Sequence, residues 1–338
     1  MIDLRPWLDA VPSAVVERLT TAKRVLAVGH ENPDADTIGA TLAVCRLVER
    51  RGATATAVFA DPPPPIYDFL PGIHRARTDP DPAIDYDLLV TSDCASLDRI
   101  GSVADRHPEL FARLPRVVID HHASNDTSGE ADWIEPASAA TCEMATLLAV
   151  RLGAPLDLDD GALALELMAG IVMDTATFAH PNATPRTLAV SAALVEAGAP
   201  LSEISRRLYR SKPDAQLRLF GTVLGRLATA ANGRIVHSTL LDADLAASGA
   251  IPAHSEGIID LLAQAERSEV AILFKEAGDG TRISVRTKPG GVDATVLTGV
   301  FGGGGHARAS GATLVVPIEE ARRLVLAETE RLVAAVRR

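Results

Sequence analysis

Short runs of apolar residues alternate with longer segments of helical periodicity between residue 24 and about residue 180. This rhythm is typical of a sheet of parallel strands joined by helices. The pattern predicts strands over residues 25–28, 54–59, 88–90 and 117–119. It predicts helices over residues 38–48, 139–152 and 161–173. We therefore expect an α/β domain with a parallel sheet in the N-terminal part of the chain.

The apolar pattern changes twice further along the chain. It is wholly helical from about residue 184 to 230, where Pro185 suits a helix start and Gly198 a helix end. From Gly233 the strand rhythm returns, with predicted strands over 234–240, 270–275, 282–287 and 312–316 and helices over 256–265, 293–300 and 318–336. The sequence thus predicts an α/β domain over 1–183, a helical connector over 184–231 and a smaller α/β domain over 232–338.

Composition and charge disfavour several classes of protein. The 338 residues carry a net charge of −11, and aromatic residues make up only 4%. Both features disfavour the binding of long nucleic acid duplexes, which depends on many phosphate contacts, and extended base stacking. No apolar run reaches the roughly 18 residues of a membrane span, and the acidic residues Asp3 and Asp9 do not fit a signal peptide. The three cysteines form no CxxC pair, so we expect a cytoplasmic protein with no membrane partner.

Acidic residues and histidines gather where the predicted strands and one predicted helix end. In chain order they are His30, Asp34, Asp36, Asp93, Asp120, His121, His122 and Asp174. Because ligand sites of open α/β sheets lie at the carboxyl ends of the strands, we expect these side chains to converge. So many carboxylates would repel one another unless cations lay among them. Carboxylates and imidazoles without a thiolate favour manganese or magnesium over a structural zinc site.

Each of these positions has a simpler interpretation when it is taken alone. A single aspartate after a strand is more often a turn residue or a helix cap than a ligand. Asp34 and Asp36 fit a turn before the helix at Ile38, and His121 and His122 fit a loop. That interpretation has to hold independently at four strand or helix ends, so we favour a shared metal site.

The triplet Asp120-His121-His122 resembles the motif for which the DHH phosphoesterase superfamily is named. Residues 30–36 are similar to the first motif of that family, H-x-x-P-D-x-D, and Asp93 and Asp174 match its second and fourth motifs. Residues 301–311 resemble the glycine-rich signature of the DHH-associated C-terminal domain. The resemblance covers nearly the whole chain. The length and domain order of the chain are similar to those of a compact bacterial subfamily of bifunctional oligoribonucleases and pAp phosphatases (pAp is 3′-phosphoadenosine 5′-phosphate).

The resemblance implies two divalent cations, with manganese favoured and magnesium or cobalt as alternatives. One ion is assigned His30, Asp34 and Asp93 as ligands. The other ion is assigned Asp36, Asp93, His121 and Asp174, so Asp93 bridges the two. Two cations held together in this way can neutralise phosphate oxygens during an in-line displacement.

The resemblance also implies catalytic roles for three residues. His122 is free to touch the scissile phosphate or assist the leaving oxygen, and Asp120 orients an imidazole or a water, while Asp93 bridges the ions. The chain departs from the family at Ala35 and Ala176, where relatives often carry glycine, and both changes alter local backbone freedom. His180 lies near a motif and has no assigned role.

A second set of candidate residues lies near the C-terminus and suggests substrate binding. Ser284 and Arg286 share one face of a predicted strand, where Arg286 is suited to bidentate phosphate binding. Glycines let backbone N–H groups approach an anion, and the histidine that follows adds a donor. The full set is Ser284, Arg286, Gly303, Gly304, Gly305, His306 and Arg308. The alternatives are a solvated strand arginine and a flexible glycine linker.

The resemblance implies a cytoplasmic hydrolase that acts as a phosphodiesterase or exoribonuclease and as a 3′(2′),5′-bisphosphate nucleotidase. Its substrates would be short oligoribonucleotides (nanoRNA), pAp and cyclic or linear di-adenylate, and its assembly a homodimer. One alternative is a catalytically inactive nucleotide sensor, which has no need of a full ligand set. A family II-type pyrophosphatase is disfavoured because its C-terminal motif is basic, not glycine-rich. A tRNA-editing module is disfavoured by the net charge of −11.

Overall fold

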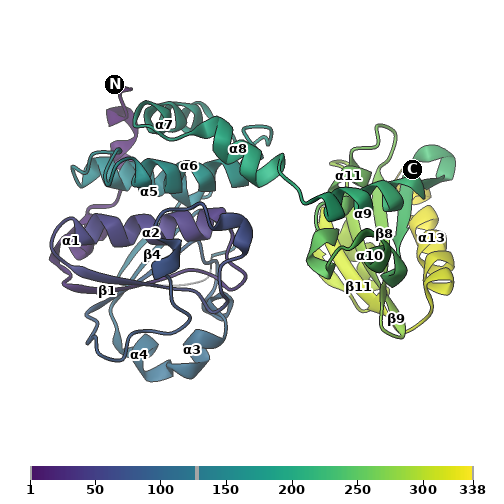
Figure 1. The fold of residues 1–338 in the computed structure, drawn as a ribbon, viewed down its shortest axis with the longest axis horizontal. Coiled ribbons are helices and arrows are strands. Elements are labelled where there is room, and N and C mark those ends of the chain that lie inside the picture. The colour runs from purple at the N-terminus through teal and green to yellow at the C-terminus, as the bar shows by residue number, and fades with distance from the viewer. Residues whose placement is uncertain (1, 126–128, 337–338) are drawn as a thin grey trace. The chain divides into compact units, whose positions relative to one another are not determined.

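The computed structural model of the chain describes residues 2–125 and 129–336 (Figure 1). It divides into two compact units, Met1–Ser211 and Lys212–Arg338. Each unit has its own β-sheet with helices packed on it, which confirms the predicted α/β class. Of the helices within residues 184–231, α7 (Pro185–Glu196) and α8 (Leu201–Tyr209) belong to the first unit and α9 (Asp214–Gly225) to the second.

The sheet of the first unit has five parallel strands in the order β2-β1-β3-β4-β5. The strands are β1 (Arg24–Val28), β2 (Thr54–Val58), β3 (Leu88–Ser92), β4 (Arg116–Asp120) and β5 (Ala131–Ile134). The first four were predicted from their apolar runs. The edge strand β5 was missed because its four residues alternate between buried and exposed and contain no apolar run.

Alternate residues of these strands point to opposite faces of the sheet, and helices cover both faces (Figure 1). Val25 and Ala27 share a core with α2 (Ala35–Glu49), α5 (Thr141–Arg151) and α6 (Ala162–Asp174). Leu26 and Val28 share another with α3 (Ser102–Arg106) and α4 (Pro108–Arg113). The helix α1 (Ser13–Thr21) contributes to the first of these cores.

Helices α7 and α8 pack against α6. Their inward residues Val190, Leu194 and Ile204 are fully buried. No single helix in the described residues is long and apolar enough to cross a membrane. The pair α7 and α8, which is bent by 112°, meets that test together by length and composition only.

The second unit has a mixed six-stranded sheet in the order β10-β11-β9-β8-β7-β6, in which only β7 and β8 pair in parallel. The strands are β6 (Ala228–Ala230), β7 (Ile235–Leu240), β8 (Val270–Ala277), β9 (Gly280–Thr287), β10 (Gly304–His306) and β11 (Ala309–Leu314). One face packs on α12 (Ala294–Gly299) and α13 (Ile318–Ala335). The other packs on α9 and α11 (Ile258–Ala263), and α10 (Asp242–Ser248) contacts α9.

Short 3₁₀ turns complete the described structure. They are η1 (Arg5–Ala10), η2 (Pro65–Tyr67), η3 (Ile73–Arg75), η4 (Leu97–Ile100), η5 (Ala231–Gly233) and η6 (Pro252–Ser255). Pro65 and Pro252 each begin such a turn, as expected of a residue with fixed φ and no backbone N–H.

The glycine-rich segment differs from the expected loop, because part of it is the edge strand β10, joined to β11 by a tight turn. Two of its glycines are required by this pairing. A Cβ on Gly303 would lie 2.2 Å from the carbonyl oxygen of Gly311, and one on Gly305 would lie 2.6 Å from that of Ala309. Gly305 also has a φ of +144°. Close backbone approach within the sheet therefore accounts for both glycines.

Candidate metal centre

The predicted site residues of the first unit come from three neighbouring strand ends and two helix ends. His30 follows β1, Asp93 follows β3, and His121 and His122 follow β4, whose last residue is Asp120. The remaining three carboxylates belong to helices. Asp34 is the N-cap of α2, Asp36 lies in its first turn, and Asp174 is the last residue of α6. Asp34 caps α2, because its Oδ1 accepts hydrogen bonds from the backbone N–H groups of Asp36 and Thr37.

The ligand atoms of these residues form three groups. Within each group, the atoms all lie within 4.8 Å of one another. The groups are His30-Asp34-Asp93, Asp36-His121-Asp174 and Asp93-His121-His122. Asp93 links them, since its Oδ2 lies 3.6 Å from His30 Nε2 and its Oδ1 lies 3.5 Å from His121 Nε2. All six predicted metal ligands therefore lie in one connected cluster. Each group can hold a metal ion.

The two most buried carboxylates of the cluster are held by residues at the starts of α5 and α2. The backbone N–H groups of Thr141 and Cys142 donate to the two carboxylate oxygens of Asp36 at 2.7 and 2.8 Å. The hydroxyls of Thr37 and Thr141 donate to Asp93 Oδ2 and Oδ1 at 2.6 and 3.0 Å. Asp93 itself has a left-handed φ of +56°, an uncommon conformation for a non-glycine residue. Its carboxylate is therefore fixed by both backbone and hydrogen bonds.

Burial and mutual repulsion disfavour the charged form of several carboxylates in this cluster. Burial, with the charges of Asp93 and Asp174, raises the pKa of Asp34 to about 6. The same causes raise the pKa of Asp36, and burial also raises that of Asp174. Burial lowers the pKa of His121, but its 3.1 Å contact with Asp174 and the nearby carboxylates outweigh this and raise it to about 10. Positive charge is therefore favoured among these groups.

The donor atoms of the cluster suit a hard or borderline divalent cation. They are carboxylate oxygens and imidazole nitrogens. This set of donors suits manganese or magnesium better than structural zinc. The nearby thiol of Cys142 is fully buried, and burial and the charge of Asp36 raise its pKa well above the ordinary value. Its Sγ lies 3.4 Å from the backbone oxygen of Asp36, to which it donates. The residues present therefore fit the cations that the sequence predicted.

Asp120 and His122 form a separate hydrogen-bonded pair beside the cluster. His122 Nδ1 lies 2.8 Å from Asp120 Oδ1, and the side-chain amide of Asn125 donates to Asp120 Oδ2 at 2.6 Å. Burial opposes ionisation of Asp120, yet these hydrogen bonds outweigh it and lower its pKa. The hydrogen bond to Asp120 raises the pKa of His122. Asp120 is fully buried and the His122 side chain is 34% exposed, so the imidazole is oriented from the protein side.

Close packing of α2, α5 and α6 brings the helical ligands together. A Cβ on Gly170 of α6 would lie 2.5 Å from Asp36 Oδ1 and 2.4 Å from the Cys142 sulfur. A Cβ on Gly39 of α2 would lie 2.4 Å from the backbone oxygen of Glu166. Both glycines therefore allow an approach that no larger residue permits without movement. The close packing of α2 on α6 therefore sets the distance between Asp36 and the C-terminal end of α6.

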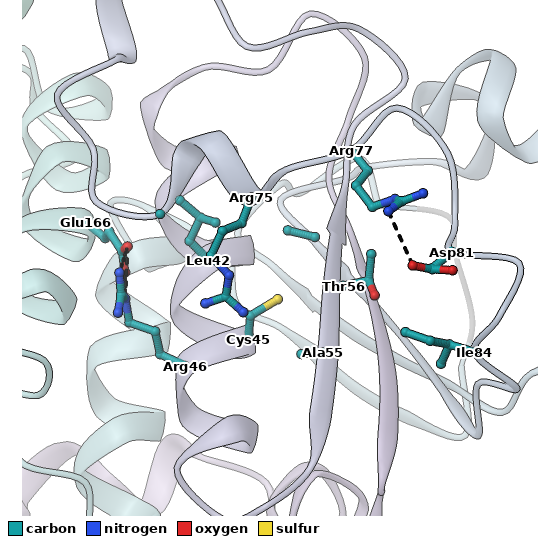
Figure 2. A pocket seen from close by; sticks show the side chains of 12 residues that line it. Leu42, Cys45, Arg46, Ala55, Thr56, Arg75, Arg77, Asp81, Ile84 and Glu166 are labelled. Carbon is teal, nitrogen blue, oxygen red and sulfur yellow. Dashed lines mark hydrogen bonds and ion pairs between the residues drawn. The ribbon is translucent and has the colours of Figure 1, made fainter.

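A buried ion pair joins the same two helices further from the ligands. Arg46 of α2 donates from Nε and Nη2 to the carboxylate of Glu166 on α6 at 2.8–3.0 Å. Beside it lies a cavity of about 230 Å³, whose lining includes Arg46, Arg75, Arg77 and Glu166 (Figure 2). Each of these arginines already contacts a carboxylate, with Arg75 paired to Glu49. None of the predicted site residues lines this cavity.

The predicted residues of the second unit lie around β9, β11 and β10. Residues directly opposite one another on antiparallel strands share a face. Arg286 is opposite Ala309, which is opposite His306, and Ser284 is opposite Gly311, which is opposite Gly304. The side chains of Ser284, Arg286 and His306 therefore share one face, with small residues between them. Arg286 Nε also donates to Asp260 of α11 at 2.9 Å.

The other three predicted residues of this set are placed differently. Gly303 and Gly305 pack closely against β11. Arg308 lies in the turn between β10 and β11, where its Nη1 donates to the backbone oxygen of Lys288 at 2.7 Å.

Several residues around the metal cluster were not found from the sequence. Thr37 and Thr141 hold the candidate ligand Asp93, and Asn125 holds Asp120, through the hydrogen bonds described above. Isolated hydroxyl and amide residues gave no pattern to find them. His180, left without a role, has its Nδ1 3.0 Å from the backbone oxygen of Asp174. Ala176, where relatives often carry glycine, takes a left-handed φ of +47°, so the departure falls where glycine would relieve strain.

Comparisons with known proteins agree with this arrangement. Family models match the DHH family N-terminal domain over residues 24–171 and the DHHA1 domain over residues 232–335. A Thermus thermophilus protein named bifunctional oligoribonuclease and PAP phosphatase NrnA is 32% identical over 285 residues, covering 84% of this chain and 82% of that protein. A Bacillus subtilis protein of the same name is 27% identical over 305 residues, covering 90% and 92%.

A solved structure supports the fold. An exopolyphosphatase-related protein from Bacteroides fragilis has a TM-score of 0.85 and 20% identity, covering 97% of this chain and 98% of that one. The chain therefore belongs to the DHH family of phosphoesterases. Within that family it is an NrnA-like hydrolase. The predicted family and enzyme class are confirmed.

Proposed function

We propose that this phosphoesterase releases mononucleotides from very short oligoribonucleotides and dephosphorylates pAp, with cyclic and linear di-adenylate as further substrates. The observation that carries the proposal is the convergence of six candidate ligands, Asp93 among them, at the carboxyl edge of the parallel sheet. The substrate class is supported by the two relatives whose names give oligoribonuclease and PAP phosphatase activities. A cytoplasmic location suits such substrates.

The proposed ligand sets are supported by the groups that the side chains form. His30, Asp34 and Asp93 would hold one divalent ion. The second would be held by Asp36, Asp93, His121 and Asp174, whose nearest contact is the 3.1 Å between His121 Nε2 and Asp174 Oδ2. We propose manganese, because it accepts imidazole and carboxylate together. Bound ions of this kind offset the negative charge that develops on phosphate oxygens during displacement.

His122 is the proposed general acid. Its Nδ1 is occupied by Asp120, so its Nε2 is the nitrogen left to face a phosphate ester. The hydrogen bond to Asp120 raises the pKa of His122, which favours a protonated ring that can donate to the leaving oxygen. Asp120 acts through His122 by fixing the tautomer and orientation of the ring, and Asn125 in turn holds Asp120.

The second unit is proposed to bind the terminal nucleotide. Arg286 presents a planar guanidinium suited to a phosphate, with Ser284 and His306 on the same face of the sheet. Gly304 leaves open space beside them, since a Cβ there would meet nothing within 4 Å. Gly303 and Gly305 shape the strand that carries His306, and Arg308 closes its turn.

Initial rates on substrates of different length test this function. We expect the highest kcat/KM for pAp or for oligoribonucleotides of two to four residues. A 24-residue RNA should be cleaved at least about tenfold less efficiently, equivalent to ~1.4 kcal/mol of barrier. The chain is acidic and poor in aromatic residues, so it offers few contacts to additional nucleotides. The salt dependence of kcat/KM should therefore be shallow. Equal efficiency on the 24-residue RNA and on a dinucleotide would overturn the proposal.

A further inference from the structure

Tyr209 is unusual among the aromatic residues of this chain. Aromatic residues make up 4% of the sequence. Among the residues that the structure describes, Tyr209 is the most exposed of them, with 37% of its surface accessible. The others are buried or half-buried. More than a third of its surface is therefore accessible to a ligand.

The position of Tyr209 places it beside the metal cluster. It is the last residue of α8, and its hydroxyl donates to the backbone oxygen of Met173 at 2.7 Å. The residue that follows Met173 in the chain is the candidate ligand Asp174. The hydroxyl is thus anchored one residue from a proposed metal ligand.

We propose that the ring of Tyr209 is a stacking surface for the nucleobase of the substrate whose phosphate lies at the metal cluster. The proposal rests on the proposed function and adds a contact for the base to it. Stacking on an aromatic ring tolerates any base, because every base has a π-face. The hydrogen bond to Met173 holds the ring in place before a substrate arrives, so little rotational freedom is lost on binding.

A purely structural role would depend on a different part of the side chain. If Tyr209 served only to join α8 to α6, the hydroxyl that reaches Met173 would be the important group. Stacking instead depends on the ring. Tyr209→Phe removes the hydroxyl and keeps the ring, whereas Tyr209→Leu removes both. The two variants therefore separate the explanations.

The experiment compares pAp with 3′,5′-bisphosphorylated ribose, which is pAp without its adenine. The measured quantity is the ratio of kcat/KM for pAp to kcat/KM for the abasic compound. We expect Tyr209→Leu to lower this ratio about 5- to 150-fold, which corresponds to about 1–3 kcal/mol of stacking. Tyr209→Phe and Tyr209→Trp should keep the ratio within about twofold of wild type, a difference of ~0.4 kcal/mol.

Phe69→Leu is the matched control. It removes a half-buried ring of the same unit that packs against Arg207 of α8, and it should not change the ratio. An unchanged ratio in Tyr209→Leu would overturn the proposal, as would an equal fall in Tyr209→Phe and Tyr209→Leu. If wild type hydrolyses no nucleotide at all, the proposed function fails instead. If Tyr209→Leu does not fold, Phe and Trp variants with a lowered ratio would still overturn the stacking role.

Discussion

The two regions with candidate functional residues are held in place in different ways. Around Asp93, candidate ligands at the ends of β1, β3, β4, α2 and α6 are buried or half-buried, and hydrogen bonds hold Asp93 in place. Around Arg286, the candidate side chains lie on one face near the edge of a sheet, and His306 is exposed. The first region is built to hold charge in a fixed geometry, as preorganised catalysis requires. The second is open enough to admit a ligand.

The difference also separates two uses of glycine. In the first unit, Gly170 lets a helix approach Asp36, so its absent side chain serves the ligand geometry. In the second unit, Gly303 and Gly305 allow close strand pairing, and only Gly304 has open space around it. A glycine-rich sequence is therefore no proof of an anion-binding loop. The pairing partner β11 decides what most of these glycines do.

Among the substitutions that test this difference between the two regions, Asp93→Ala should have the largest effect on activity. It removes a carboxylate from two of the three ligand groups, so kcat on pAp should fall at least about 100-fold, or ~2.7 kcal/mol. Bound manganese should fall as well, as metal analysis of the purified protein would show. Asp98→Ala is the control, because Asp98 is an exposed residue of η4 nearby in sequence. Retention of more than about a tenth of wild-type turnover would exclude a bridging role.

Gly170→Ala tests whether the helix crossing serves the metal cluster. The new Cβ would lie 2.5 Å from Asp36 Oδ1, so neighbouring groups must move. We expect manganese to bind at least about tenfold more weakly (~1.4 kcal/mol) and the fold to lose about 1–3 kcal/mol of stability. Gly221→Ala in α9 is the matched control, since a Cβ there meets nothing within 4 Å. Unchanged manganese affinity in Gly170→Ala, measured by titration, would contradict the account.

Arg286→Ala should act on substrate binding and leave the metal cluster intact. KM for pAp should rise about tenfold, or ~1.4 kcal/mol, with bound manganese near the wild-type amount. Arg323→Ala removes the same charge from α13, which packs on the opposite face of the sheet, and should leave KM unchanged. Loss of bound manganese in Arg286→Ala would mean that the second unit helps to form the metal site.

The sequence predicted the parallel strands and the convergence of the candidate ligands because both follow from simple rules. Apolar runs identify buried strands, and polar residues just after them lie at one edge of a parallel sheet. The short strand β5 was missed since it lacks an apolar run. The pairing of β10 with β11 was also missed, because glycine leaves no side-chain pattern and strand register depends on distant residues. Thr141 and Asn125 could not be found, since their roles arise only from tertiary contacts.

In the proposed function, the cluster around Asp93 holds the divalent cations that drive hydrolysis. The most direct measurement is a manganese titration of chelator-treated protein, following both bound metal and the rate of pAp hydrolysis. We expect no hydrolysis in excess chelator, and a rate that recovers as about two ions bind per chain. Manganese should restore the rate better than calcium, because the ligands include imidazoles. Full activity in excess chelator would contradict the account.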